Sequence, residues 1–169
     1  MVAQNIGVCI LNTAGVPLSG PIIHSQPQPK FMLDHPDARM PYRSKERSVG
    51  LDIHPCEDTY IGAGKTVLVP SGLRCSFNYG WGAFFWDRSG MGFKGFHRFA
   101  GVIESDYVGF WGVVLYNSTT DGKWFDRDKA IVQVVFQPVW MGEPEQVDSI
   151  DMDTDRGEKG FGSTDEKSS

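Results

Sequence analysis

The segment WDRSGMG, residues 86–92, brings together three donor groups that suit phosphate oxygens. Arg88 carries a fixed fork of N–H donors, Ser89 a hydroxyl, and Gly90 a backbone N–H that no side chain obstructs. The segment begins at the last residue of GAFFW, residues 82–86, an apolar run typical of a β-strand. An isolated RSG is also compatible with an ordinary turn that bears a surface arginine, so these residues alone leave both interpretations open.

A second segment, AGVIESDYVG, residues 100–109, places two carboxylates and a tyrosine close together. Glu104 and Asp106 are two residues apart, and residues at that spacing lie on one side of a β-strand, so both carboxylates could point into one site. One of them could activate a water molecule, whereas exposed acids on a hairpin are the alternative. Tyr107 is either an ordinary packed aromatic or a platform for a sugar or base.

A third segment, RGEKGFGST, residues 156–164, sets a lone aromatic in an otherwise polar tail. A flexible linker has little use for Phe161. An arm that closes over a ligand could stack this ring on a base, while Arg156, Ser163 and Thr164 meet phosphates. A stray aromatic in a disordered tail is the alternative.

Two single residues are weaker candidates for the same site. Asp52, in SVGLDI, is either a satisfied acid at a strand end or a group that orders metal-bound water. Gln133, in AIVQVVF, is either a polar residue within a strand or a phosphate donor. Neither residue decides between these interpretations by itself.

The elements that must position these residues are short runs rich in β-branched and aromatic residues, separated by Gly, Pro, Asn and Asp clusters. Such runs favour strands, and no window has the caps and periodicity of a long amphipathic helix. We therefore expect an all-β fold, either a closed barrel or a sandwich. The predicted strands are 6–12, 49–53, 66–70, 73–77, 82–86, 110–117 and 131–140.

Two segments depart from the strand pattern. Residues 13–45 are aperiodic and contain Pro, His and Gln, which predicts a long surface loop or arm. Residues 143–169 are acidic and polar, so we expect them to form a mobile C-terminal arm. A chain of 169 residues suits one β domain, which we place at residues 1–142.

The overall composition limits the class of partner. A net charge of −5 argues against a broad nucleic-acid surface, although a single nucleotide needs only a few local cations. The sequence lacks a secretory signal and the roughly 20 continuous apolar residues of a membrane span, so we expect no membrane contact and a cytoplasmic location, in the host cytoplasm if the source is viral. Its three cysteines have no CxxC spacing, which favours neither a disulfide framework nor a zinc site.

Taken in order, these segments resemble the five motifs of the trimeric dUTPase family, from about Met40 to Thr164. The five matches are SVGLDI, DRSG, GVIESDYVG, DKAIVQVVF and RGEKGFGST. KTVLVPSGL also resembles the family's strand and turn between the first two motifs, and Asn117 falls where the family commonly has an asparagine. In the fourth motif residues 128–130, Asp-Lys-Ala, replace the usual Gly-Asp-Arg, a change that we expect to affect interface packing more than chemistry.

The resemblance implies a jelly-roll-like β-barrel of the dUTPase type that assembles as a homotrimer. The active sites would lie at subunit interfaces, with each C-terminal arm reaching over a neighbour's site. Residues 13–39 would be an inserted loop or arm, because the family usually has a shorter first loop. The implied substrate is dUTP, and the implied reaction is its hydrolysis to dUMP and pyrophosphate.

The resemblance also assigns roles to single residues. Groups of the second, fourth and fifth motifs would hold the phosphates, and backbone groups of the third-motif hairpin would bind the uracil edge. Phe161 would stack on uracil, and Tyr107 would pack under the deoxyribose and exclude a 2′-hydroxyl. The residues implied to bind substrate are Arg88, Ser89, Gly90, Gly101, Val102, Ile103, Tyr107, Gln133, Arg156, Phe161, Gly162, Ser163 and Thr164.

The implied cofactor is Mg²⁺, held by the triphosphate and by waters rather than directly by protein groups, with Asp52 helping to order the site through water. Water would attack the α-phosphorus in line, and the acid of the third motif would orient and deprotonate it. The family usually has aspartate at that position, whereas this chain has Glu104, whose carboxylate extends one methylene further. Asp52 and Glu104 are therefore the implied catalytic residues.

Departures from the family pattern keep other functions open. The segment 91–100 is shorter than usual and contains His97 and Arg98, so a pyrophosphatase acting on dCTP or on a modified deoxyuridine triphosphate is one alternative. A deaminase of the same fold needs a further acid after the third motif, and WGVVLYN contains none. A nucleotide-binding regulatory protein with low turnover is the rival from another class, motivated by Glu104 and the insertion at 13–39.

Overall fold

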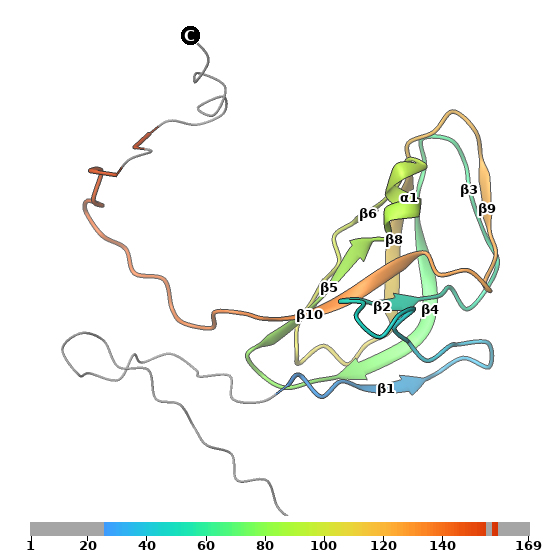
Figure 1. Cartoon of the computed structure of the whole chain (residues 1–169), viewed down its shortest axis with the longest axis horizontal. Helices are drawn as coiled ribbons and strands as arrows, with labels where there is room; N and C mark the ends of the chain where they lie inside the picture. Colours follow the sequence, from blue (N-terminus) through green and yellow to red (C-terminus); the bar gives the residue numbers. More distant parts are fainter. Residues whose placement is uncertain (1–25, 155–156, 159–169) are drawn as a thin grey trace, which may run out of the picture.

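The computed structural model describes residues 26–154 and 157–158, and in these residues strands dominate (Figure 1). The prediction of an all-β fold is confirmed. The predicted strand 6–12 lies outside the described residues. Within the described part of the chain, α1 (Ser89–Phe93) is the single helix, and no helix there is long and apolar enough to cross a membrane.

Two four-stranded antiparallel sheets form the body of the molecule. The strand order is β1-β4-β8-β6 in one sheet and β2-β10-β5-β7 in the other, and a separate two-stranded ribbon of β3 and β9 projects at one end (Figure 1). The bounds of the strands are β1 Lys30–Leu33, β2 Leu51–Ile53, β3 Thr59–Ile61, β4 Thr66–Ser76, β5 Trp81–Asp87, β6 Phe96–Phe99, β7 Val102–Ile103, β8 Trp111–Asn117, β9 Lys123–Phe125 and β10 Val132–Pro138.

The core lies between the two sheets because their strands turn alternate residues inward. In β8, Trp111, Val113 and Leu115 are buried, while the residues between them are partly exposed. The Trp111 ring contacts Phe31 of the first sheet and Phe85 of the second, both edge to face, at centroid distances of 5.4 and 5.6 Å. Aromatic contacts of this kind add about 0.5–1.5 kcal/mol each beyond the area they bury. Trp111 therefore joins the two layers.

β4 is one strand, although the sequence predicts two at 66–70 and 73–77. Its register against β8 shifts between Pro70 and Leu73, which marks a bulge. Gly72 lies in this bulge with φ +66°, and a Cβ added there would come within 2.6 Å of the His35 side chain. The Pro-Ser-Gly sequence thus bends the strand without ending it.

Part of the segment predicted as a surface loop, 13–45, forms β1 and packs against the barrel. β1 pairs with β4 along its whole length. The sequence of β1, KFML, does not predict a strand, because its residues do not alternate between buried and exposed. Three ion pairs hold the residues that follow it. They are Arg74–Asp34 at 2.7 Å, Arg127–Asp37 at 2.9 Å, and Arg39–Asp128.

Asn117, at the end of β8, is fully buried and hydrogen-bonded at both ends of its amide. Its Nδ2 donates to the carbonyl oxygens of Ile61, at 3.1 Å, and Asp121, at 2.8 Å. Its Oδ1 accepts from the backbone N–H and the hydroxyl of Thr119, at 2.9 and 2.7 Å. Asn117 therefore fastens the β3–β9 ribbon to the barrel and fixes the turn after β8.

Residues 139–154 follow β10, form no helix or strand, and lead away from the barrel (Figure 1). Nearly all of their side chains are exposed. This stretch includes the beginning of the segment 143–169 that the sequence marks as an arm.

Candidate active site

The turn between β5 and α1 borders a cavity of about 430 Å³, here called the Arg88 cavity. Arg88, Ser89 and Gly90 all line it, so the three donor residues of the second motif do lie together. The wall is completed by residues from other parts of the chain, among them Tyr42, His54, Lys94 and Lys129.

Arg88 is fixed by two contacts at the base of this cavity. Its Nε lies 3.2 Å from Oδ1 of Asp52, and its NH1 donates to the carbonyl oxygen of Ala130 at 2.7 Å. The Asp52 side chain is only 10% exposed, so the ion pair is largely shielded from solvent. Asp52 therefore orients the guanidinium. The two contacts of Arg88 together connect the second motif to Asp52 of the first and to Ala130 of the fourth.

The backbone at Gly90 is open to a ligand. A Cβ added at Gly90 would meet no atom within 4 Å, so packing does not require glycine there. Gly90 lies in the first turn of α1, where backbone N–H groups have no partner within the helix. A negatively charged oxygen can approach this amide without meeting a side chain.

Gln133 lies beside the cavity without lining it. Its Nε2 donates to the carbonyl oxygen of Asp87 at 3.1 Å, and a Cβ added at Gly50 would lie 2.4 Å from its Oε1. The close approach of Gly50 and this hydrogen bond hold the amide in place. A contact between Gln133 and phosphate stays a prediction.

Cations dominate the Arg88 cavity, although the chain as a whole carries a net charge of −5. Lys94 and Lys129 line it, and no carboxylate of the described residues lies within ion-pair distance of either. Asp128 also lines it, but its carboxylate pairs with Arg39. Residues 128–130, which differ from the usual fourth motif, thus line the cavity. The sequence had suggested a role in interface packing and not a place in this cavity.

His54 is a further residue of this cavity, and no sequence motif singled it out. Only 4% of it is exposed, and its ring stacks on Tyr42 at a centroid distance of 5.7 Å. Burial, followed by the positive charge of Arg39, lowers the pKa of His54 below its ordinary value. The imidazole is therefore mainly neutral at pH 7.

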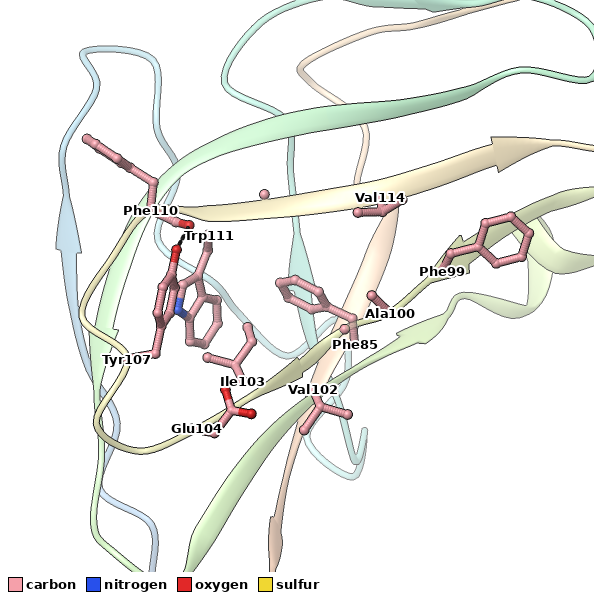
Figure 2. Close-up of a pocket in the computed structure, with 12 residues that line it drawn as sticks. Phe85, Phe99, Ala100, Val102, Ile103, Glu104, Tyr107, Phe110, Trp111 and Val114 are labelled. Carbon is pink, nitrogen blue, oxygen red and sulfur yellow. Dashed lines mark hydrogen bonds between the residues drawn. The ribbon is translucent and has the colours of Figure 1, made fainter.

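A second cavity, of about 220 Å³, lies beside β7 and is here called the Glu104 cavity (Figure 2). Its walls are mostly apolar, and the aromatic residues Phe85 and Trp111 line it, whereas the Phe110 ring points away, with its centroid 3.7 Å from Cζ of Arg74 (Figure 2). Glu104 is the one charged side chain among the residues that line it. The cavity also includes four other residues that the sequence selected, namely Gly101, Val102, Ile103 and Tyr107.

Glu104 and Asp106 do not share one face of a strand, and both residues are exposed, which is the alternative that the sequence left open. β7 ends at Ile103, and the chain then turns, with Tyr107 N–H donating to the Glu104 carbonyl oxygen at 3.2 Å. The alternation of a strand cannot extend through a turn. Glu104 lines the cavity, whereas Asp106 does not.

Tyr107 is held at the edge of the Glu104 cavity. Its hydroxyl donates to the carbonyl oxygen of Phe110 at 3.0 Å, drawn as a dashed line in Figure 2. A Cβ added at Gly109 would lie 2.5 Å from the Tyr107 hydroxyl oxygen, so only glycine allows the backbone to pass so close. The ring is therefore fixed while 45% of the residue is still exposed.

The turn between β6 and β7, which belong to different sheets, is held by backbone geometry and by Asp87. Ala100 and Gly101 both have positive φ, +55° and +96°, and Phe85 N–H donates to the Gly101 carbonyl oxygen at 2.8 Å. The Asp87 carboxylate lies 3.0 Å from Nδ1 of His97 and accepts from Arg98 N–H at 2.8 Å. Neither His97 nor Arg98 lines the Glu104 cavity.

The two cavities share no lining residue. One is lined by Glu104 and Tyr107, and the other by Arg88, Ser89 and Gly90, whose donors suit phosphates. Five selected residues lie outside the described part of the chain, namely Arg156, Phe161, Gly162, Ser163 and Thr164.

Within residues 26–154 and 157–158, no group of three or more His, Cys, Asp or Glu side chains is arranged to hold a metal ion. Asp52, whose carboxylate lies 3.2 Å from Nε of Arg88, is engaged by that guanidinium. A metal ion at the Arg88 cavity would therefore take most of its ligands from a bound molecule and from water.

Comparison with known proteins agrees with this arrangement. The family model described as dUTPase matches residues 36–165. The deoxyuridine 5′-triphosphate nucleotidohydrolase of Monkeypox virus is 34% identical over 138 residues, which cover 80% of this chain and 89% of the viral protein. The enzyme of the same name from Solanum lycopersicum is 34% identical over 157 residues, covering 83% of this chain and 92% of the plant protein.

Solved structures of dUTPases share the fold. The Staphylococcus bacteriophage 80alpha dUTPase with dUpNHpp superposes with a TM-score of 0.74 at 23% identity, covering 80% of this chain and 96% of that one. A mutant dUTPase of phage phi11 of S. aureus, described for its coordination of a structural Mg(II) ion, gives a TM-score of 0.68 at 19% identity, with 72% and 97% covered. The predicted jelly-roll-like β-barrel is confirmed.

Proposed function

The chain belongs to the dUTPase family, and from that premise we propose that it hydrolyses dUTP to dUMP and pyrophosphate in the cytoplasm. One observation carries the proposal. Apart from Gln133, the described residues assigned to the nucleotide are distributed between a cationic cavity around Arg88 and a mostly apolar cavity that contains one carboxylate, Glu104. These are the two environments that a triphosphate and a nucleoside require.

The triphosphate binds in the Arg88 cavity. Arg88 is pre-oriented by Asp52 and Ala130, so its guanidinium meets the phosphate oxygens without losing further freedom. Ser89 and the Gly90 amide add donors, and Lys94 and Lys129 add charge. Mg²⁺ would be held by the triphosphate and by water, and it would supply neutralisation of the charge on the phosphates. Asp52 helps to order this complex through water.

The nucleoside binds in the Glu104 cavity, where the chemistry takes place. The backbone of residues 101–103 binds the uracil edge, and Tyr107 packs against the deoxyribose. Glu104 orients a water molecule for in-line attack at the α-phosphorus and accepts its proton. Positioning of the water and neutralisation of charge supply most of the rate enhancement.

A homotrimer brings the two cavities together. Since they share no lining residue, we propose that the Glu104 cavity of one subunit faces the Arg88 cavity of the next. The arm at 143–169 of each chain reaches over a neighbour's site, with Arg156, Ser163 and Thr164 at the phosphates and Phe161 and Gly162 at the base. The exposed apolar residues near the Glu104 cavity, Phe99, Val102 and Phe110, support contact with another subunit there.

A pyrophosphate-release assay across dUTP, dCTP, dTTP and UTP tests the proposed activity. We expect dUTP to give the highest kcat/KM, because neither His97 nor Arg98 lines the Glu104 cavity to favour another base. Preference for dCTP would indicate the alternative pyrophosphatase. Tight binding of dUTP without release of pyrophosphate would indicate a regulatory nucleotide-binding protein.

Replacing Tyr107 with alanine is expected to reduce the ratio of kcat/KM for dUTP over UTP by about tenfold or more, because steric rejection of a single group is worth on that order. The fixed Tyr107 ring leaves no room for a 2′-hydroxyl. Tyr107→Phe keeps the ring and loses only the hydrogen bond to Phe110, so it should retain most of the discrimination. An unchanged ratio in Tyr107→Ala would place sugar discrimination elsewhere.

A further inference from the structure

His54 is a nearly fully buried polar side chain in the wall of the Arg88 cavity. It follows β2, two residues beyond Asp52, and only 4% of it is exposed. Its ring stacks on Tyr42, which lines the same cavity. The stack fixes the plane of the imidazole, so its nitrogens have defined directions relative to the cavity.

The two ring nitrogens differ in their surroundings. Nδ1 is buried and has no hydrogen-bond partner among the described residues. A proton on Nδ1 would be an unpaired buried donor, and a doubly protonated ring would add a buried charge. The favoured form is therefore the neutral tautomer with its proton on Nε2. Because Nδ1 lies on the buried side of the ring, the Nε2 edge borders the cavity.

We propose that His54 is a substrate-binding residue that donates a hydrogen bond from Nε2–H to a phosphate oxygen in the Arg88 cavity. The inference rests on the proposed function, since it assigns a further contact to the same triphosphate. It explains why an imidazole occupies a wall that otherwise presents Arg88, Ser89 and Lys129 to the same space. A neutral donor adds direction to phosphate binding without adding charge, which keeps pyrophosphate from binding still more tightly as a product.

The experiment compares four variants in binding of α,β-imido-dUTP, a non-hydrolysable analogue. His54→Phe keeps a ring to stack on Tyr42 but has no donor, and His54→Asn places an amide nearer the position of Nδ1. Both should raise the Kd by about tenfold or more, because a hydrogen bond to a charged group is lost. His54→Gln places an amide nitrogen near the position of Nε2 and should restore most of the affinity. His35→Phe is the matched control, because His35 is exposed and outside the cavity.

Deoxyuridine binding separates a lost phosphate contact from a damaged fold. It should be equal in the parent and in all four variants, because the nucleoside does not reach the Arg88 cavity. Equal Kd values for the analogue in the parent and in His54→Phe would overturn the inference. So would a Kd for His54→Gln that is raised as much as the Kd for His54→Asn.

Nitrogen NMR of the parent protein decides the case if a variant fails to fold. The spectrum should show protonated Nε2 and unprotonated Nδ1 for His54, and the Nε2 signal should shift when α,β-imido-dUTP is added. An Nε2 signal unmoved at saturation would overturn the inference. Failure of the proposed function is a distinct result, since the parent would then release no pyrophosphate from any of the four nucleotides.

Discussion

Glu104→Gln is expected to lower kcat for dUTP by about 10²- to 10⁴-fold, the usual contribution of a general base, while the Kd of α,β-imido-dUTP changes little. Glutamine keeps the size of the side chain and its capacity for hydrogen bonds, but it cannot accept the proton of the attacking water. Among the described residues Glu104 is the one charged group that lines its cavity, so none of their carboxylates can replace it there.

Asp106→Asn is the matched control for this experiment. Asp106 carries the same chemical group two residues away, lies in the turn after β7 and does not line the cavity, so its substitution should leave kcat close to the parental value. If Glu104→Gln keeps the parental rate with normal affinity, Glu104 is not the base. A loss of activity in Asp106→Asn instead would assign that role to Asp106.

Glu104→Asp asks whether the longer side chain is required. Aspartate is the residue that the family usually has, and it withdraws the carboxylate by one methylene. A higher rate would show that glutamate is a compromise in this chain. A lower rate would show that the shortened 91–100 segment sets the backbone so that only glutamate reaches the water.

Deleting residues 155–169 is expected to preserve the fold and to lower kcat/KM by about 10²-fold or more, since several charge-assisted hydrogen bonds to phosphate are lost. The core cluster of the described residues lies between positions 31 and 136, so we expect the barrel to fold without the deleted segment. Circular dichroism and thermal unfolding should match the parent. A truncated chain with parental activity would contradict the closing-arm role.

Mixing the two inactive proteins tests whether active sites are shared. Glu104→Gln chains and truncated chains are unfolded together and refolded, so that mixed trimers form. If the arm and Glu104 of one site come from different subunits, roughly a quarter of the sites in a random mixture contain both intact parts. Activity should then reappear. A mixture as inactive as its components, or an active species with the mass of one 18.8 kDa chain in sedimentation, would rule out shared sites.

Much of the fold is predictable from the sequence because long apolar runs leave few alternatives. The runs at 82–86, 110–117 and 131–140 match β5, β8 and β10, which pack against the core. The short strands are different. β3 and β9 have three residues each, and Tyr60 and Trp124 within them are exposed, so local pattern carries little signal. Their pairing depends on Asn117, which lies far from β3 in the sequence.

The site was predictable in its residue types and less so in its geometry. DRSG indicates phosphate donors, and Arg88, Ser89 and Gly90 do line one cavity. The spacing of Glu104 and Asp106 would place both side chains on one face only if the strand continued beyond Ile103, where it ends. His54 carried no signal at all, since a single histidine has no spacing to interpret. Only the fold reveals that its Nδ1 is buried and that its ring borders the Arg88 cavity.

The hydrogen bonds around Asn117 also affect how readily this asparagine deamidates. Asparagine amides hydrolyse slowly to carboxylates when the next backbone nitrogen attacks the side-chain carbonyl. That nitrogen belongs to Ser118, and here it is held by a hydrogen bond to the Gly95 carbonyl oxygen at 2.9 Å. The folded state therefore resists this damage. If residue 117 deamidates while the chain is unfolded, refolding would place a carboxylate oxygen against the carbonyl oxygens of Ile61 and Asp121. A chain kept unfolded for a long time would therefore not form the β3–β9 ribbon again.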